Sequence, residues 1–171
     1  MKFEIIKTDK KARAGLITLN ENEVETPTFM PVATRGTIKS TPHEYLDKTS
    51  ILLANAYHLH LRPGAEIINN HGGLHKFMNW DKLILTDSGG FQAWSLPTKL
   101  YEDGIEFKNV YDGSYFKLTP QDSIKTQNLL GSDIAMIFDC LIGVDKPDKE
   151  QKKAIEITKQ WATIAKDTHD N

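Results

Sequence analysis

Polar side chains follow three short apolar runs in this sequence, at the points where buried β-strands would end. They are Asn55, Asp87 and Asp139. In parallel βα sheets, reactive side chains collect where strands end and loops begin, because the strand fixes the backbone and the loop leaves room for a ligand. We therefore expect all three side chains at one rim of one sheet, where the two carboxylates could transfer protons or accept hydrogen bonds.

Asp87 begins the segment 87–92, which reads DSGGFQ. The pair Gly89 and Gly90 permits positive φ and close backbone approach, so that amide N–H groups can face a ligand. Phe91 offers a flat apolar face on which a ring could stack. Because no lysine or arginine adjoins the glycines, the segment suits a planar, hydrogen-bonding heterocycle better than a phosphate. The alternative is a glycine turn that the Asp87 side chain caps.

A carboxylate at the end of an apolar strand must be hydrogen-bonded, charge-paired or exposed to a wet cleft. Asp139 could accept hydrogen bonds from the ring N–H and exocyclic amine of a guanine-like edge, or it could bond to a neighbouring loop. Cys140 is a poor candidate for a nucleophile, because no histidine lies close to it in sequence. His58 and His60 form a poor zinc signature, so we expect their ring nitrogens to make hydrogen bonds.

The composition is that of an ordinary globular protein: 171 residues, 39% hydrophobic, 26% charged, with a net charge of −2. Such a chain can bury a core, which excludes wholesale disorder. Its single cysteine excludes an internal disulfide and a multi-thiolate zinc site. It has neither a long apolar run nor a secretory leader, so we expect a cytoplasmic protein with no membrane contact. Any nucleic-acid binding must come from a local patch or from chain that is not present.

The pattern of apolar residues and turn signals predicts the elements that would position these side chains. Residues 1–25 predict short strands, and the alternation that begins after Pro27 predicts four βα units on a parallel sheet. The predicted strands are 28–32, 51–54, 83–86 and 134–138. Four helices are predicted: one opens with a capping box at Thr41, two span 65–71 and 119–131, and the last begins near Pro147. A hairpin is predicted over 105–118, with its turn at Asp112-Gly113.

Four units are half of an eight-fold barrel, and the chain is shorter than the roughly 250 residues typical of a complete one. A four-stranded parallel sheet would leave two strand edges unpaired. The predicted fold class is therefore α/β, the N-terminal part of a (β/α)₈ TIM-type barrel. Residues 1–171 would form one half of the catalytic domain, with residues 1–25 as short antiparallel strands before it, and the second half would be absent.

Three segments of the sequence resemble tRNA-guanine transglycosylase, also called queuine tRNA-ribosyltransferase. They are residues 55–64 (NAYHLHLRPG), 72–81 (GGLHKFMNWD) and 85–92 (LTDSGGFQ), and residues 118–120 and 130–134 agree with them. The resemblance implies a modified (β/α)₈ barrel with a zinc-binding subdomain late in the chain. It also implies the exchange of guanine at the anticodon wobble position of tRNA for a 7-deazaguanine, either queuine or its precursor.

The resemblance implies roles for the positions that match the family's motifs. Asp87 would transfer the proton, Phe91 would stack on the purine, and Asp139 would bind its Watson–Crick edge. The base pocket would be lined by Ser88, Gly89 and Gly90, and Ile38, Leu53 and Asn55 would lie near the ribose. Residues 138–140 read Phe-Asp-Cys where the family usually has Asp-Glu-Cys, a departure that bears on base selectivity.

The family's nucleophilic aspartate, which attacks ribose C1′, and its three-cysteine, one-histidine zinc site belong to a second half that this sequence lacks. We therefore expect no metal or other cofactor in this chain and no exchange by the chain alone. The expected partners are the tRNA anticodon loop, a guanine or 7-deazaguanine base, and either a C-terminal-half chain or a homo- or hetero-oligomer. The alternatives are a non-catalytic accessory subunit that binds purine or tRNA and pairs with another chain, and a decayed product that does not fold stably.

Overall fold

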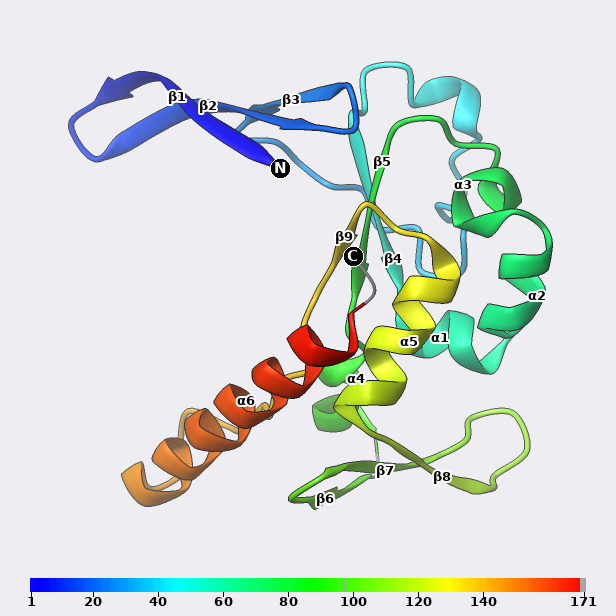
Figure 1. The fold of residues 1–171 in the computed structure, drawn as a ribbon, viewed down its shortest axis with the longest axis vertical. Helices are drawn as coiled ribbons and strands as arrows, with labels where there is room; N and C mark the ends of the chain where they lie inside the picture. Colours follow the sequence, from blue (N-terminus) through cyan, green and yellow to red (C-terminus); the bar gives the residue numbers. More distant parts are fainter. Residues whose placement is uncertain (97, 170–171) are drawn as a thin grey trace.

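A computed structural model describes residues 1–96 and 98–169, which form a mixed α/β structure with three separate three-stranded sheets (Figure 1). The strands are β1 (Lys2–Asp9), β2 (Ala12–Leu19), β3 (Asn22–Thr26), β4 (Ile51–Asn55), β5 (Leu83–Asp87), β6 (Thr98–Tyr101), β7 (Gly104–Lys108), β8 (Tyr115–Leu118) and β9 (Ile134–Ala135). The helices are α1 (Ala56–Leu61), α2 (Ala65–Asn70), α3 (Gly73–Met78), α4 (Gly90–Ser95), α5 (Pro120–Leu130) and α6 (Asp148–Thr168), with the 3₁₀ turn η1 (His43–Tyr45). None of the helices in these two ranges has both the length and the apolar character needed to cross a membrane.

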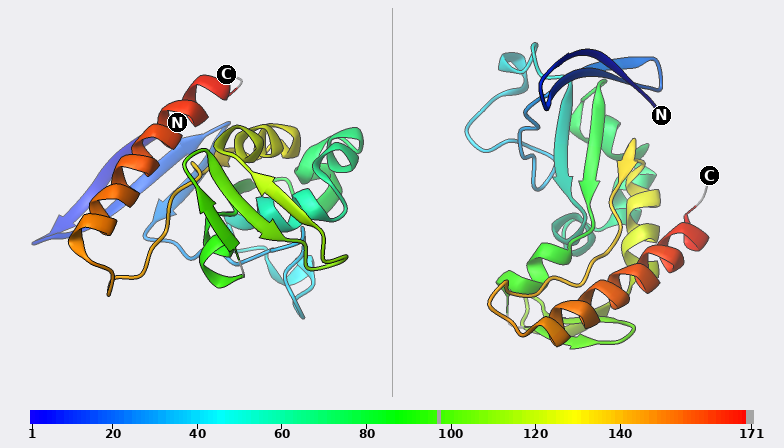
Figure 2. Two further views of the ribbon diagram at one scale, coloured as in Figure 1. Left: turned by 90° about the horizontal axis from the view of Figure 1, so that it is seen from below. Right: turned by 90° about the vertical axis from the view of Figure 1, so that its left-hand side faces the viewer.

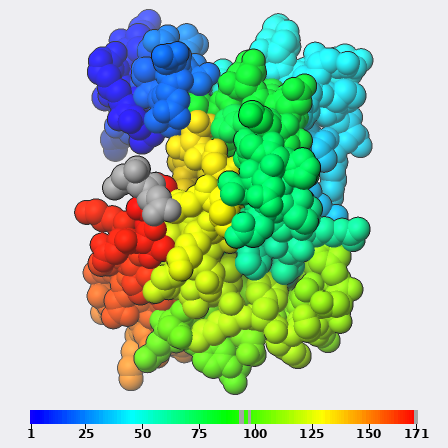
Figure 3. Space-filling view, turned by 45° about the vertical axis from the view of Figure 1, so that its right-hand side comes forward, coloured from blue at the N-terminus to red at the C-terminus, as the bar shows by residue number. Residues whose placement is uncertain are grey.

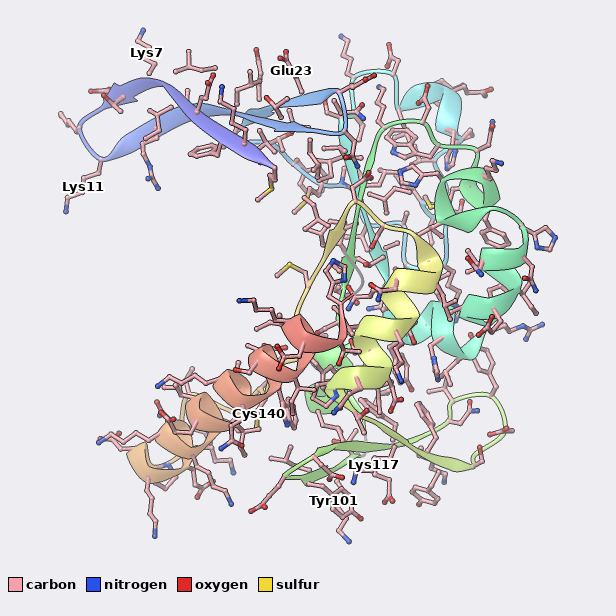
Figure 4. All side chains as sticks on the ribbon, in the orientation of Figure 1. Lys7, Lys11, Glu23, Tyr101, Lys117 and Cys140 are labelled. Atoms are coloured by element: carbon pink, nitrogen blue, oxygen red, sulfur yellow. The ribbon has the colours of Figure 1, made fainter. Side chains whose placement is uncertain are left out.

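β1, β2 and β3 form an antiparallel sheet in which each strand pairs with the next along the chain. The sheet projects from the body of the molecule, and every residue of β1 is exposed (Figure 1). Figure 4 shows Lys7 and Lys11 pointing away from the body at its far end. The strands predicted in residues 1–25 are therefore confirmed.

β4, β5 and β9 form a parallel sheet with β5 in the centre. Its register pairs Asn55 at the end of β4 with Asp87 at the end of β5. Side chains alternate between the two faces of a strand. One face, which includes Leu52 and Ile84, packs into a core with α2, α3 and α5, whereas Leu85 on the other face is only partly covered. Figures 1 and 2 show these helices on one side of the sheet, with β1–β3 and α6 reaching out on the other.

Two of the four predicted parallel strands differ in the structure. The strand predicted over 28–32 is reduced to a single bridge between Val32 and Leu53, in a segment where Pro31 has no N–H to donate to a sheet. The strand predicted over 134–138 ends at Ala135. Met136 donates its N–H both to the carbonyl of Thr86 and to the Gln127 side chain, and the chain then leaves the sheet. The described parallel sheet therefore has three strands instead of four.

Local capping signals predict one helix correctly and one incorrectly. Thr119 and Asp122 form the reciprocal capping box of α5, and Gly131 ends that helix with a positive φ of 66°. The helix predicted at Thr41 is only the short turn η1, whose cap Pro42 makes no side-chain hydrogen bond. No residue of this turn is buried, so no apolar face stabilises a longer helix. The helix predicted over 65–71 is confirmed as α2, whereas α1, α3 and α4 were not predicted.

The predicted hairpin over 105–118 is confirmed as β7 and β8, and β6 adds a third antiparallel strand. This sheet packs against α1 through aromatic rings. The ring of Tyr57 lies 5.0 Å from that of Phe107 and 6.0 Å from that of Phe116. The hairpin is therefore attached to the helix that follows β4.

The predicted C-terminal helix is confirmed as α6, which buries Ala154, Ile157, Trp161 and Ala165. Trp161 stacks on Phe138 at 5.2 Å and donates a hydrogen bond to the carbonyl of Glu102. These contacts attach the loop after β9 and the β6–β7 turn to the same helix. Figure 3 shows the N-terminal sheet and α6 as two lobes on the same side of the molecule.

Candidate active site

Asn55 and Asp87 lie side by side at the carboxyl ends of β4 and β5. The side-chain amide of Asn55 donates a hydrogen bond of 2.6 Å to Asp87 Oδ2 and another of 3.2 Å to Gln92 Oε1. Asn55 Oδ1 accepts from the N–H of His58 and so caps α1. The side chain of Asn55, which is 5% exposed, therefore fixes the position of the Asp87 carboxylate relative to both strands.

The other oxygen of Asp87 binds backbone N–H groups. Asp87 Oδ1 accepts from Ala56 at 3.2 Å and from Gly89 at 3.1 Å. The second bond is the glycine-turn cap that the sequence left open as an alternative, and it is present. It does not account for the whole environment of Asp87, because the same carboxylate lines a cavity of about 400 Å³.

The two glycines after Ser88 permit close approach of the chain to its neighbours. Gly89 has a φ of 82°, and a Cβ there would lie 2.8 Å from the Cβ of Tyr57. A Cβ at Gly90 would lie 2.5 Å from Asp139 Oδ1. Any larger side chain at either position would push the turn away from α1 or from the second carboxylate.

Buried polar side chains of α5 make hydrogen bonds to the carboxyl end of β5 and to the loop after β9. Ser123 donates a hydrogen bond of 2.8 Å to the carbonyl of Ser88. Gln127, which is 1% exposed, accepts from Thr86 Oγ1 and bonds to both the N–H and the carbonyl of Met136. These bonds hold the end of β5 and the start of the loop that carries Asp139 at a fixed spacing.

Asp139 faces the cavity that Asp87 lines, although it does not follow a strand directly. The cavity is also lined by Phe91, which is 56% exposed, and by Ser88, Gly90, Met136, Ile137, Leu141 and Thr158. The side chain of Asp139 accepts no hydrogen bond from another residue in the described ranges. A half-buried carboxylate without a protein partner is available to a ligand's N–H groups.

Burial shifts both carboxyl groups toward the protonated form. It raises the pKa of Asp87 to about 6, the nearby charge of Asp139 contributes to the rise, and the hydrogen bonds from Gly89, Ala56 and Asn55 oppose it. Burial also raises the pKa of Asp139. With a pKa near 6, Asp87 can give up and regain a proton close to neutral pH, which general acid–base catalysis requires.

The neighbouring thiol and one of the neighbouring histidines lie close to polar groups of other elements. Figure 4 places Cys140 beside α6, where its N–H donates to Thr158 Oγ1 and burial raises the pKa of its thiol. His60 Nδ1 lies 3.1 Å from Thr126 Oγ1. In the described part of the chain, no three His, Cys, Asp or Glu residues are grouped as metal ligands would be.

Comparison with known proteins gives the family. Residues 8–171 match the family described as queuine tRNA-ribosyltransferase. The chain belongs to this family. Proteins named queuine tRNA-ribosyltransferase from Pseudoalteromonas translucida, Thermoanaerobacter pseudethanolicus and Buchnera aphidicola are 47%, 48% and 49% identical to it, over 99%, 100% and 95% of the chain. The matches cover 46%, 47% and 45% of these relatives, so the chain spans about half the length of the curated relatives it matches.

The structure brings together most of the positions that the resemblance to queuine tRNA-ribosyltransferases marked. Asp87, Ser88, Gly90, Phe91 and Asp139 line one cavity, and Gly89 forms the turn between them. Alternation along β4 places Leu53 on the same face as Asn55. Ile38 packs against the core between the sheet and the helices, and no contact recorded among the described residues links it to Asp87. The roles of all these residues stay predictions.

Three polar residues of this chain contribute to the candidate site without having been predicted. Gln92 accepts from Asn55, and Ser123 and Gln127 hold the glycine turn and the loop after β9. Gln92 is the last residue of the 87–92 segment, so its position beside Asp87 was a usable signal. No sequence signal marks Ser123 or Gln127, because their role depends on how α5 packs on the sheet.

Proposed function

We propose that this chain supplies the base-binding and proton-transferring half of a tRNA-guanine transglycosylase. The enzyme would exchange guanine at the anticodon wobble position of tRNA for a 7-deazaguanine, queuine or its precursor. The observation that carries the proposal is that Asp87, with a pKa near 6, lines the same cavity as Asp139 and Phe91. The proposal also places the protein in the cytoplasm, where tRNA is found.

Each of the three side chains suits a separate part of a purine. The carboxylate of Asp139 would accept hydrogen bonds from the ring N–H and exocyclic amine of guanine. The ring of Phe91 would stack on the base. Asp87 would face the atom that gains or loses a proton, and the base would have to be flipped out of the RNA stack to reach it.

The exchange would proceed in two balanced steps. In the first, an aspartate of the remaining half would bond to ribose C1′ while the C1′–N9 bond breaks, and Asp87 would give its proton to the leaving guanine. In the second, N9 of the incoming base would displace the carboxylate from C1′, and its proton would pass to Asp87. A group with a pKa near 6 is populated in both forms at neutral pH.

The remaining half would complete both the site and the fold. We place the nucleophile and the zinc subdomain in the half of the relatives' length that this chain does not match. The same half would pair with the open side of β9 and close the parallel sheet into a (β/α)₈ barrel, of which residues 1–171 would be the N-terminal part. The face that carries Asn55 and Asp87 would then line the barrel interior.

The test combines binding with reconstitution. The chain alone should bind free 7-deazaguanine and should not incorporate labelled guanine into tRNA in a single turnover. Addition of a C-terminal half taken from a relative should restore incorporation. Robust incorporation by the chain alone would contradict the assignment of the nucleophile to the other half. Base binding with no turnover after addition would favour a non-catalytic accessory subunit.

A further inference from the structure

Two arginines converge on one aromatic ring beside the candidate site, and a lysine lies near the histidine of the adjoining helix. The guanidinium carbon of Arg35 lies 5.8 Å from the centroid of Tyr111, and that of Arg62 lies 5.6 Å from it. Arg35 lies in the loop before η1, Arg62 caps the end of α1, and Tyr111 lies in the turn between β7 and β8. Lys39 is close enough to His58 for its charge, together with that of Arg35, to lower the pKa of the histidine after the larger effect of burial.

Within the described part of the chain, these three cations have no acidic partner. No ion pair within residues 1–96 and 98–169 includes Arg35, Lys39 or Arg62, and all three residues are exposed. Like charges that gather without a counter-charge repel one another and create a positive local potential. Such an arrangement is stabilised when an anion binds between them.

Two buried polar atoms next to the cations also lack a partner. The hydroxyl of Tyr57, whose side chain is 1% exposed, and Nδ1 of His58 make no hydrogen bond to any residue that the structure describes. The charge of Tyr111 contributes, after burial, to the raised pKa of Tyr57, so the two phenols lie close together. Buried polar atoms are rarely left without a partner in folded proteins, and a bound ligand or ordered water would satisfy them.

The cluster adjoins the Asp87 cavity through short, continuous contacts. Thr34, the residue before Arg35, accepts a hydrogen bond from the N–H of Asn55. Asn55 in turn caps α1, the helix that carries His58, and binds Asp87. The cations therefore lie at the same end of the sheet as the base cavity, where the chain on either side of a flipped nucleotide would run.

We propose that Arg35, Lys39 and Arg62, with Tyr111, bind backbone phosphates of the RNA next to the nucleotide whose base enters the Asp87 cavity. The proposal rests on the proposed function, because it takes RNA as the substrate. A guanidinium group binds phosphate through two parallel hydrogen bonds. The ring of Tyr111 holds both guanidinium groups in place, which reduces the conformational freedom they lose when phosphate binds.

The test measures binding of a fluorescent anticodon stem-loop RNA to this chain over a range of salt concentrations. The double variant Arg35→Gln/Arg62→Gln should bind at least tenfold more weakly than the wild type. Its plot of log affinity against log salt should be shallower by roughly 0.7 for each single-strand phosphate that the variant no longer neutralises. Arg35→Lys in the wild-type background keeps the charge and should lose less affinity. Far-ultraviolet circular dichroism and a thermal melt verify that each variant is folded.

A matched control removes two positive charges elsewhere. Lys152→Gln/Lys166→Gln changes two exposed lysines of α6 and should leave the salt slope unchanged. The proposal is wrong if the arginine variant binds RNA like this control or if the wild-type chain does not bind RNA at all. It is also wrong if a polyaspartate peptide of equal charge competes as well as RNA, since the site would then recognise acidic protein.

Separate readouts distinguish this site from the proposed function. Binding of free 7-deazaguanine should be unchanged in Arg35→Gln/Arg62→Gln and weakened in Asp139→Asn. If the arginines prove to bind RNA but the chain never supports exchange with a complementary half, the phosphate site stands and the proposed function fails. If exchange is restored but RNA affinity does not change when the arginines are replaced, the proposed function stands and the phosphate site fails.

Discussion

At the carboxyl ends of β4 and β5 the buried side chains are polar and hydrogen-bonded, whereas beside β9 the exposed side chains are apolar. Asn55 and Asp87 satisfy one another and the start of α1. On the flank formed by residues 136–144 and α6, Met136, Ile137, Leu141, Val144 and Ile155 are 44%, 41%, 40%, 96% and 55% exposed. A groove of about 480 Å³ runs between that loop and the helix.

This difference indicates which parts of the site are complete within this chain. The rim formed by Asn55 and Asp87 obtains its hydrogen bonds from β4, β5, α1 and the glycine turn, so its geometry does not depend on any other surface. The flank leaves apolar area in contact with water, which is unfavourable unless another surface covers it. The chain therefore holds a preorganised part of the site next to a surface that is ready to be covered.

The largest expected effect is loss of catalysis when Asp87 can no longer carry a proton. Asp87→Asn keeps the shape of the side chain and its ability to accept from Gly89 and Ala56, but removes the titratable group. Exchange by the chain combined with a complementary half should fall by about 10²–10⁴-fold. Single-turnover incorporation of labelled guanine into tRNA measures this.

The matched control for that variant is at the other end of the same strand. Asp81 lies two residues before β5 and is exposed, so Asp81→Asn should leave the rate unchanged. Equal rates for Asp87→Asn and wild type would show that the buried carboxylate at the rim has no part in proton transfer.

The same carboxylate should make stability depend on pH. The folded-state pKa of Asp87, about 6, lies above the unfolded value of about 3.9. The folded protein therefore holds this proton more tightly, and the contribution of Asp87 is lost as the pH rises from about 4 through about 6. Relative to Asp87→Asn, the wild type should lose up to about 3 kcal/mol of unfolding free energy between pH 4 and pH 7.5.

Urea unfolding of the wild type and of Asp87→Asn at both pH values measures this difference. Titrating groups that the two proteins share contribute equally to both, so their effects cancel in the comparison. The histidine pair His75–Asp133, for example, titrates in both proteins. A difference between the two proteins that does not change with pH would mean that water reaches Asp87 and keeps its pKa near the ordinary value.

A smaller loss is expected when the rim loses the residue that connects its parts. Asn55→Ala removes the cap of α1 and the shortest hydrogen bond to Asp87, which should lower the free energy of unfolding by about 1–3 kcal/mol. Asn69→Ala changes an exposed asparagine of α2 and should cost less than about 0.5 kcal/mol. Urea midpoints provide the measurement, and similar values for the two variants would show that the rim does not depend on Asn55.

Sequence reasoning succeeded where the signal is local. α5 was predicted at both ends because Thr119 and Gly131 act on the helix through their own residues. β4 and β5 were predicted because they are buried, apolar and short. β9 was predicted too long because its end depends on Gln127, a side chain from another element that binds Met136. No local pattern contains that contact.

In the candidate site, too, the contacts within one segment could be predicted and the contacts between separate segments could not. Asp87 and Phe91 lie four residues apart in one turn, so their shared cavity could be predicted from the segment 87–92. The approach of Asp139 to Gly90 brings together the loop after β9 and the first residue of α4, and it could only be proposed from the order of strands. The contacts of Arg35 and Arg62 with Tyr111 join three separate elements, and no sequence pattern marks them.

Replacement of one exposed isoleucine on the flank should have the smallest effect on stability. It should also distinguish the flank from the rest of the surface most clearly. Ile155 and Ile67 are both exposed on helices, at 55% and 48%, but only Ile155 lines the groove beside the loop after β9. Replacing either by aspartate should change the unfolding free energy of the chain by no more than about 0.5 kcal/mol.

If the flank is covered by a complementary half, Ile155→Asp buries an unpaired charge there. It should then weaken association with that half at least tenfold, as measured by calorimetry, whereas Ile67→Asp should not. Equal association of the two variants would mean that the groove stays open to water in the assembled protein and that the missing half packs elsewhere.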